Sequence, residues 1–192
     1  MDQKRKENRE KILSATVEEF HEKGLKFTMD DIAKRLGMSK KTIYVVFRDK
    51  EDLFMNMADY FSVQVKTEEE NILKDESLTT IEKLTAVLGV MPEKYQNIDF
   101  GKLYALKDKY PSIYMCVQER LETGWESTIA LIEQGMKEGV IRPVCIPVFK
   151  TMMEATLEQF FQRDILIQEK ISYQEALKEV VDILIQGIVN QA

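Results

Sequence analysis

The side chains best suited to binding another molecule lie close together between positions 39 and 50. They comprise three lysines and three hydroxyl-bearing residues: Ser39, Lys40, Lys41, Thr42, Tyr44 and Lys50. Lysine binds phosphate oxygens and the O6 and N7 atoms of guanine, and hydroxyl groups bind phosphate oxygens or approach a thymine methyl. The cluster therefore predicts a surface for DNA. The alternative is an ordinary solvated helix face, because such residues are common on protein surfaces.

Catalytic and metal-binding chemistry has much less support. The chain has a single histidine, His21, and two cysteines, Cys116 and Cys145, which are 29 positions apart. These residues cannot assemble a Cys/His zinc cage or a two-histidine metal site within one chain. The glycine-rich phosphate loops and the G-x-S-x-G nucleophile motif are also missing from the sequence. We expect no catalytic residue, no metal and no cofactor, and we expect both cysteines to be reduced.

The cluster must be positioned by the elements around it, and residues 28–47 have the spacing of two short helices joined by a tight turn. Thr28 can cap the first helix, with Asp31 three positions later as in a capping box. Gly37 can end that helix, and Ser39 can cap the second. This spacing is typical of a helix-turn-helix, whose second helix enters the major groove of DNA. Thr28 is then a further candidate for a phosphate contact at a helix start.

The orientation of the second helix follows from its apolar positions. If Ile43 and Phe47 face inward, the remaining faces of the helix project outward near its N-terminus. Those faces carry Lys40, Lys41, Thr42, Tyr44 and Val45.

Residues 9–55 resemble the N-terminal domain of the TetR family of bacterial transcriptional repressors. The first-helix pattern of that family is matched at Arg9, Ile12, Leu13, Ala15, Thr16, Phe20 and Gly24. Its following pattern, T-x-x-x-I-A-x-x-x-G-V-S-x-x-T-L-Y-x-Y-F-x-x-K-E-x-L, is matched at Thr28, Ile32, Ala33, Gly37, Met38, Ser39, Thr42, Ile43, Tyr44, Phe47, Lys50, Glu51 and Leu53. One departure is Val46, which stands where an aromatic is common and cannot form the phosphate hydrogen bond of a tyrosine. Val45 stands where His is frequent.

The resemblance implies an all-α fold of about nine helices in two domains. Residues 1–50 would form the DNA-binding domain, with its helix-turn-helix core at 28–47, and residues 51–192 a helical effector-binding and dimerisation domain. It further implies a homodimer on a palindromic double-stranded DNA operator, released by a small-molecule effector.

The helical pattern continues through the larger part of the chain. A capping box at Thr79 and Glu82 predicts one helix start, and Ser172 with Glu175 predicts another. Pro111 suits the first turn of a long helix whose apolar positions repeat up to Gly139. The segment 140–149 contains two prolines and is expected to be a connector.

Two groups of apolar residues in this part have candidate roles. Aromatic and methionine side chains suit an adaptable pocket for a largely apolar effector. The alternative for each is ordinary core, which apolar helical stripes usually form. The candidates are Tyr60, Phe61, Met91, Phe100, Tyr104, Met115 and Trp125. Residues of the last two long helices are candidates for the dimer interface or for the core of one chain: Met152, Leu157, Phe160, Leu177, Val181, Leu184 and Ile188.

Charge is divided unevenly along the chain. Residues 1–50 contain 13 Lys and Arg against nine Asp and Glu, and residues 51–192 contain 14 against 24, so the net charge of −6 combines +4 and −10. A basic N-terminal part on an acidic body suits a polyanion-binding segment carried by a body that avoids the polyanion. Apolar runs of five residues or fewer predict no membrane span, and the polar N-terminus predicts a cytoplasmic protein.

Three functions remain open at this point. The leading hypothesis is a ligand-responsive DNA-binding repressor. An activator is a variant of this hypothesis, because the position of the operator decides between repression and activation. The second is a helical module whose helix-turn-helix contacts protein. The third is an enzyme that processes a small molecule, which the residues do not favour.

Overall fold

The computed structural model describes residues 3–96 and 106–190, and these form an all-α protein in which the described part contains no β-strand. The two candidate pocket residues Phe100 and Tyr104 lie outside the described residues. The helices are α1 Gln3–Lys23, α2 Met29–Leu36, α3 Lys40–Val46, α4 Lys50–Lys74, α5 Thr80–Leu88, α7 Leu106–Lys109, α8 Pro111–Glu122, α9 Glu126–Glu138, α10 Ile146–Gln162, α11 Ile165–Gln168 and α12 Tyr173–Gln186.

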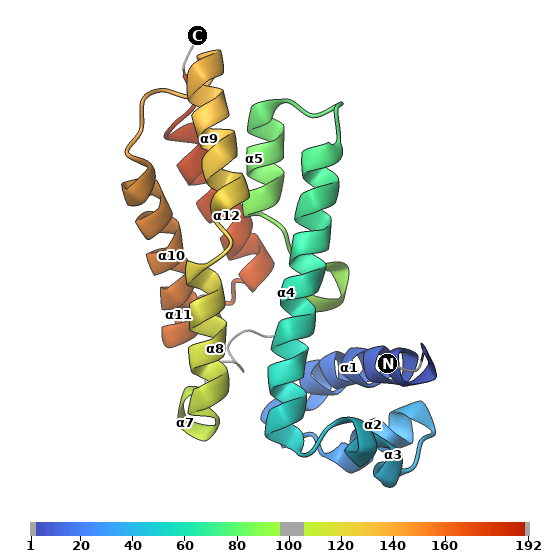
Figure 1. The fold of residues 1–192 in the computed structure, drawn as a ribbon. Helices are drawn as coiled ribbons and strands as arrows, with labels where there is room; N and C mark the ends of the chain where they lie inside the picture. The colour runs from blue at the N-terminus through green and yellow to red at the C-terminus, as the bar shows by residue number, and fades with distance from the viewer. Residues whose placement is uncertain (1–2, 97–105, 191–192) are drawn as a thin grey trace.

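The first three helices form a small head beside the start of α4 (Figure 1). The local signals in the sequence account for their ends. Thr28 and Asp31 form the expected capping box of α2, and Gly37 adopts the left-handed conformation at its C-terminus, with φ of 60°. Ser39 caps α3 and Asp49 caps α4, each by accepting a hydrogen bond from a backbone N–H in the first turn.

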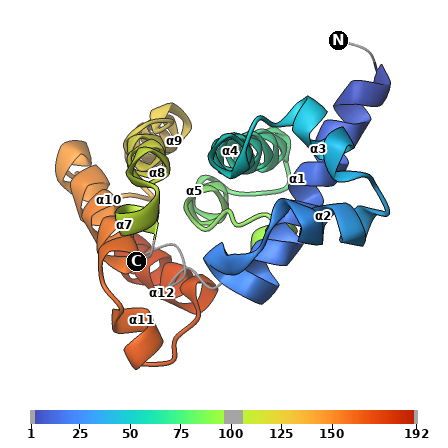
Figure 2. The same ribbon diagram turned by 90° about the horizontal axis from the view of Figure 1, so that it is seen from below.

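The 25-residue helix α4 connects this head to the larger helical body. Seen from below, α1 to α3 gather on one side of α4, and α8, α9, α10 and α12 lie on the other side (Figure 2). Within the body, α5 packs against α9, α8 packs against α4 and α10, and α12 packs against α5 and α10. The capping boxes at Thr79 and Ser172 start α5 and α12 as expected.

The prediction of one long helix from Pro111 to Gly139 is wrong, because this segment forms two helices, α8 and α9. The break lies at residues 123–125, where Gly124 has a φ of +84°. A helix cannot continue through a left-handed residue, and glycine adopts that conformation without steric cost. With this break and the two four-residue helices α7 and α11, the described residues form eleven α-helices, where about nine were expected.

The connector is shorter than the predicted 140–149, because α10 begins at Ile146 with Pro147 in its first turn. Residues 140–145 are irregular, and they are anchored to the end of the described chain. Ile141 and Val189 form an isolated antiparallel bridge. The N–H of Arg142 donates to the carbonyl of Ile188 at 2.9 Å, and the N–H of Asn190 donates to the carbonyl of Val140 at 3.0 Å. These bonds hold the end of α12 beside the end of α9.

Within the described residues, no helix combines the length and apolar character needed to cross a membrane.

Candidate DNA interface and internal cavity

Helix α3 is held on the head by its apolar residues and presents its polar residues outward. Ile43 and Phe47 are fully buried, whereas Lys41, Tyr44 and Val45 are exposed. This is the orientation expected from the sequence, because residues that face inward on a helix recur at three- and four-residue steps. Val46 is half-buried and packs against the core, so its side chain belongs to the head interior.

The two lysines at the start of α3 differ in their surroundings. The Lys40 ammonium forms an ion pair with Asp30 of α2 at 3.1 Å. Lys41 is exposed and has no hydrogen bond or ion pair to the residues that the structure describes. Lys41 therefore offers an unneutralised positive charge to an anion, whereas Lys40 must first leave Asp30.

The three hydroxyl groups of Thr28, Ser39 and Thr42 take part in capping. The Thr28 hydroxyl donates to Asp31 at 2.7 Å and accepts from its backbone N–H. Ser39 accepts from the N–H of Thr42, and the two hydroxyl oxygens lie 2.8 Å apart. Thr28 and Ser39 are exposed, so an external phosphate can approach their hydroxyls. Such a contact would be made by hydroxyls that already cap a helix.

Lys50 does not point outward as the phosphate contact would require. Its ammonium donates to the carbonyls of Leu25 and Phe27 and lies 4.1 Å from the centre of the Phe27 ring. Burial lowers the pKa of Lys50, and the neighbouring charge of Lys109 lowers it further. Lys50 therefore joins the turn after α1 to the start of α4, and we do not carry it forward as a DNA contact.

Arg48, which sequence reasoning missed, is a highly exposed cation next to α3. It lies in the turn between α3 and α4, its side chain is 85% exposed, and its guanidinium is 3.7 Å from Asp52. The signal that could have found it is a cation directly after the apolar end of a recognition helix, where the chain passes close to the DNA backbone.

An ionic cluster fixes α2 on α1. The guanidinium of Arg35 on α2 contacts three carboxylates of α1, those of Glu18, Glu19 and Glu22, at 3.0, 2.7 and 2.6 Å. Lys23 adds ion pairs with Glu19 at 2.8 Å and Asp31 at 2.9 Å. Burial alone would raise the pKa of Glu19, but the hydrogen bonds from Lys23 and Arg35 lower it overall. Glu19 is therefore ionised although only 3% of the residue is exposed.

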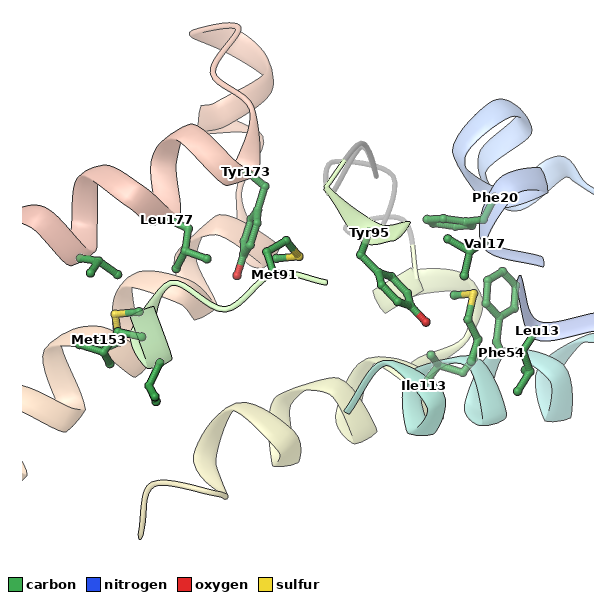
Figure 3. Packing of buried hydrophobic residues seen from close by; sticks show 14 of the residues in the cluster. Leu13, Val17, Phe20, Phe54, Met91, Tyr95, Ile113, Met153, Tyr173 and Leu177 are labelled. Carbon is green, nitrogen blue, oxygen red and sulfur yellow. The ribbon is translucent and has the colours of Figure 1, made fainter. Parts of the chain in front are cut away.

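A cavity of about 320 Å³, partly open to solvent, lies among the body helices and reaches the head at Phe20. Its longest wall is α4, which contributes residues from Phe54 to Glu69. The opposite walls come from α5, α8, α10 and α12, and Phe20 of α1 closes the end nearest the head. Figure 3 shows Met153, Tyr173 and Leu177 facing Tyr95, Ile113 and Phe54 from the body side.

The cavity includes some of the predicted pocket residues and leaves out others. Phe61, Met91 and Trp125 line it. Tyr60 does not line it, and Met115 is 67% exposed on the outer side of α8, so the prediction for Met115 is wrong. The sequence did not point to Met57, Val87, Leu88, Tyr95, Ile113 and Tyr173, which do line the cavity. Apolar residues at three- and four-residue steps indicate which side of a helix is buried, but they do not indicate which of the buried residues line a cavity.

Most of the candidate interface residues are used inside the chain. Leu177, Val181, Leu184 and Ile188 are buried among the body helices, and Leu157 and Phe160 are half-buried against the same core. For these residues the alternative to the interface was the core of one chain, and α12 does turn its richer apolar face toward its own chain. Their place in a dimer interface stays a prediction. Among the large apolar side chains of α10 and α12 whose burial the structure describes, those of Val148, Met152 and Ile183 are more than half exposed.

Among the residues that the structure describes, no three His, Cys, Asp or Glu side chains come together as a possible metal site. Cys116 and Cys145 form no disulfide.

The comparisons with known proteins agree with this geometry. Residues 12–57 match the family described as bacterial regulatory proteins, tetR family. An uncharacterized HTH-type transcriptional regulator of Bacillus subtilis (strain 168), YvaF, is 27% identical over 93% of this chain and 94% of its own length. A second regulator from the same organism, YdgC, is 27% identical over half of each chain.

Solved structures show the same fold. A TetR transcription regulator from Haloarcula marismortui superposes with a TM-score of 0.73 at 16% identity, over 96% of this chain and all of the other. A TetR-family transcriptional regulator from Rhodococcus sp. has a TM-score of 0.69 at 19% identity, over 95% and 98% of the two chains.

Proposed function

Because the chain belongs to the TetR family of bacterial transcriptional regulators, we propose that it represses transcription as a homodimer that binds a palindromic operator and is released by a small-molecule effector. DNA binding and a regulatory role follow from the family itself. The repression, the operator symmetry and the effector are the parts that we infer for this chain.

The outward face of α3 is the observation that carries the proposal. Buried Ile43 and Phe47 fix the helix on the head, so that Lys41, Tyr44 and Val45 are directed away from the protein. Lys41 and Arg48 supply positive charge, Tyr44 supplies a hydroxyl, and Val45 supplies apolar contact to a thymine methyl. Lys40, Thr28, Ser39 and Thr42 complete the proposed interface at the two helix starts.

The division of labour follows the charge. We assign DNA binding to residues 1–50 and effector binding with dimerisation to residues 51–192. The acidic body is repelled by DNA, which leaves contact to the basic heads. One recognition helix reads only a few base pairs, and two heads about 34–36 Å apart read the two halves of a palindrome.

The second subunit has an available surface on α10 and α12. Val148 and Met152 lie one turn apart on α10, and Ile183 is exposed on α12, which packs beside it. A two-fold axis at this face would pair the same residues of both chains, which is how most homodimers associate. The cavity among the body helices is the proposed effector site, because its walls are mostly apolar and its volume lies in the range of ligand pockets.

Fluorescence anisotropy with the DNA upstream of the protein's own gene tests the proposal. We expect tighter binding to that DNA than to a random duplex of equal length, and an affinity that falls steeply with salt. Scrambling one half of the palindrome should abolish the preference, and native mass spectrometry should give a dimer. Equal affinity for both duplexes at all salt concentrations would overturn the proposal and favour a protein-interaction module.

A further inference from the structure

The hydroxyl group of Tyr95 is the most informative polar atom in the cavity wall. Tyr95 ends the short 3-10 turn Glu93–Tyr95 that follows α5, and its ring packs edge-on against Phe61 of α4 with the ring centres 4.6 Å apart. Only 3% of Tyr95 is exposed, and the residue lines the cavity. Figure 3 shows its hydroxyl directed from the turn toward the side of the cavity formed by Ile113 and Phe54.

Packing alone does not explain this hydroxyl. Its oxygen is buried and has no hydrogen-bond partner within residues 3–96 and 106–190. A buried polar group without a partner costs stability, and a buried tyrosine hydroxyl usually finds one. A phenylalanine would make the same ring contact with Phe61 without that cost. An acceptor atom brought into the cavity by a ligand would remove the deficit.

The surroundings define the kind of acceptor. Burial raises the pKa of Tyr95 well above its ordinary value, and the neighbouring Tyr60 raises it further, so the hydroxyl stays protonated and can donate. Ile113, Phe54 and Phe61 surround it with apolar surface. The charged residues among the described cavity walls, Lys66 and Glu69, lie one to two turns beyond Phe61 on α4. Burial raises the pKa of Glu69, and the charge of Lys66, which already acts on this carboxyl, lowers it. An anionic acceptor beside Tyr95 would lose its hydration among apolar side chains and would have to share this one cation of the described wall with a carboxylate, which is costly.

We propose that the effector is a neutral, compact and largely apolar molecule whose carbonyl or ether oxygen accepts a hydrogen bond from Tyr95. This inference rests on the proposed function and adds the chemical class of the ligand and the residue that selects it. The cavity volume of about 320 Å³ lies at the lower end of the range for ligand sites, which favours a molecule of about two fused rings.

Two compounds of nearly equal shape test the proposed hydrogen bond. 2-Acetylnaphthalene carries a carbonyl where 2-isopropenylnaphthalene carries a methylene group. Their affinities for the full-length protein and for Tyr95→Phe are measured by displacement of the neutral dye N-phenyl-1-naphthylamine. We expect the ratio of ketone to alkene affinity to fall about fivefold in Tyr95→Phe, as the loss of one hydrogen bond predicts. In Tyr60→Phe, which loses a hydroxyl outside the cavity wall, the ratio should not change.

The unliganded variant gives a second readout. Removal of a hydroxyl without a partner should leave the urea midpoint of Tyr95→Phe equal to or above that of the unmodified protein. The inference is overturned by an unchanged affinity ratio in Tyr95→Phe, by a lower urea midpoint, or by a cavity that binds neither compound. Operator binding without ligand is measured alongside: its absence refutes the proposed function, whereas its presence with an unchanged ratio refutes only the role of Tyr95.

Discussion

Lys41 and Lys40 are neighbours in sequence, but we expect their charges to contribute unequally to DNA affinity. Lys41 is exposed with no ion pair to the described residues, and Lys40 is paired with Asp30. Lys41→Ala should weaken operator binding about tenfold near 0.1 M salt and make the slope of log affinity against log salt shallower by roughly two, one contact for each subunit. Lys40→Ala should weaken operator binding less. In the unmodified protein Lys40 must give up its ion pair with Asp30 before it contacts DNA, so its net contribution to affinity is smaller. Anisotropy titrations over a salt series measure both.

The matched control for these variants is Lys137→Ala. Lys137 is exposed in the last turn of α9, far along the chain from the head, and its replacement changes the net charge by the same amount. Equal losses of affinity for Lys41→Ala and Lys137→Ala would mean that only total charge matters, and the assignment of α3 as the recognition helix would be wrong.

At the scale of elements, the ionic cluster around Glu19 decides how firmly α2 is held on α1. Glu19→Gln removes the buried carboxylate that Arg35 and Lys23 share, and should lower the free energy of unfolding by about 1.5–3 kcal/mol at pH 7. Glu18→Gln removes the more exposed partner of Arg35 and should change it by no more than about 0.5 kcal/mol. Urea unfolding followed by circular dichroism measures both values.

The same comparison has a defined pH dependence. The folded-state pKa of Glu19 lies below its ordinary value of 4.5, so the folded protein holds the proton less tightly than the unfolded chain does. The stabilisation is therefore complete above about pH 5 and is lost as pH falls through the lower folded-state pKa. The difference between the unmodified protein and Glu19→Gln should shrink between pH 5 and pH 3. A difference that stays constant over this interval would contradict an ionised Glu19.

The sequence predicted those elements whose causes are local. The caps at Thr28, Ser39 and Ser172 depend on residues at most three positions away, and all three appear as expected. The break at Gly124 was missed, because the apolar steps on either side keep the same period through it. The inward position of the Lys50 ammonium was missed for a different reason: its partners, the carbonyls of Leu25 and Phe27, are set by how the head folds onto α4.

At the scale of the whole molecule, the cavity and the head share part of their core. Phe20 of α1 and Phe54 of α4 both line the cavity, and their rings meet edge-on with centres 5.7 Å apart. Phe54 also packs against Phe27, at 5.3 Å, and against Tyr110, which directly precedes α8, at 5.6 Å. A molecule in the cavity therefore touches the same side chains that fix α1 on α4. A shift of these rings would change how the head is carried, and with it the spacing of two heads in a dimer.

Replacement of Phe20 tests this route from effector to DNA. Phe20→Leu keeps an apolar wall but removes the ring contact with Phe54, so 2-acetylnaphthalene should still bind while its effect on operator affinity falls several-fold. By linkage, operator DNA should then also weaken ligand binding less than it does in the unmodified protein. The control is Leu157→Met, a volume-conserving change in the cavity wall formed by α10. If Phe20→Leu and Leu157→Met retain the same coupling, or if the ketone leaves operator affinity unchanged in the unmodified protein, the signal does not pass through the shared ring cluster.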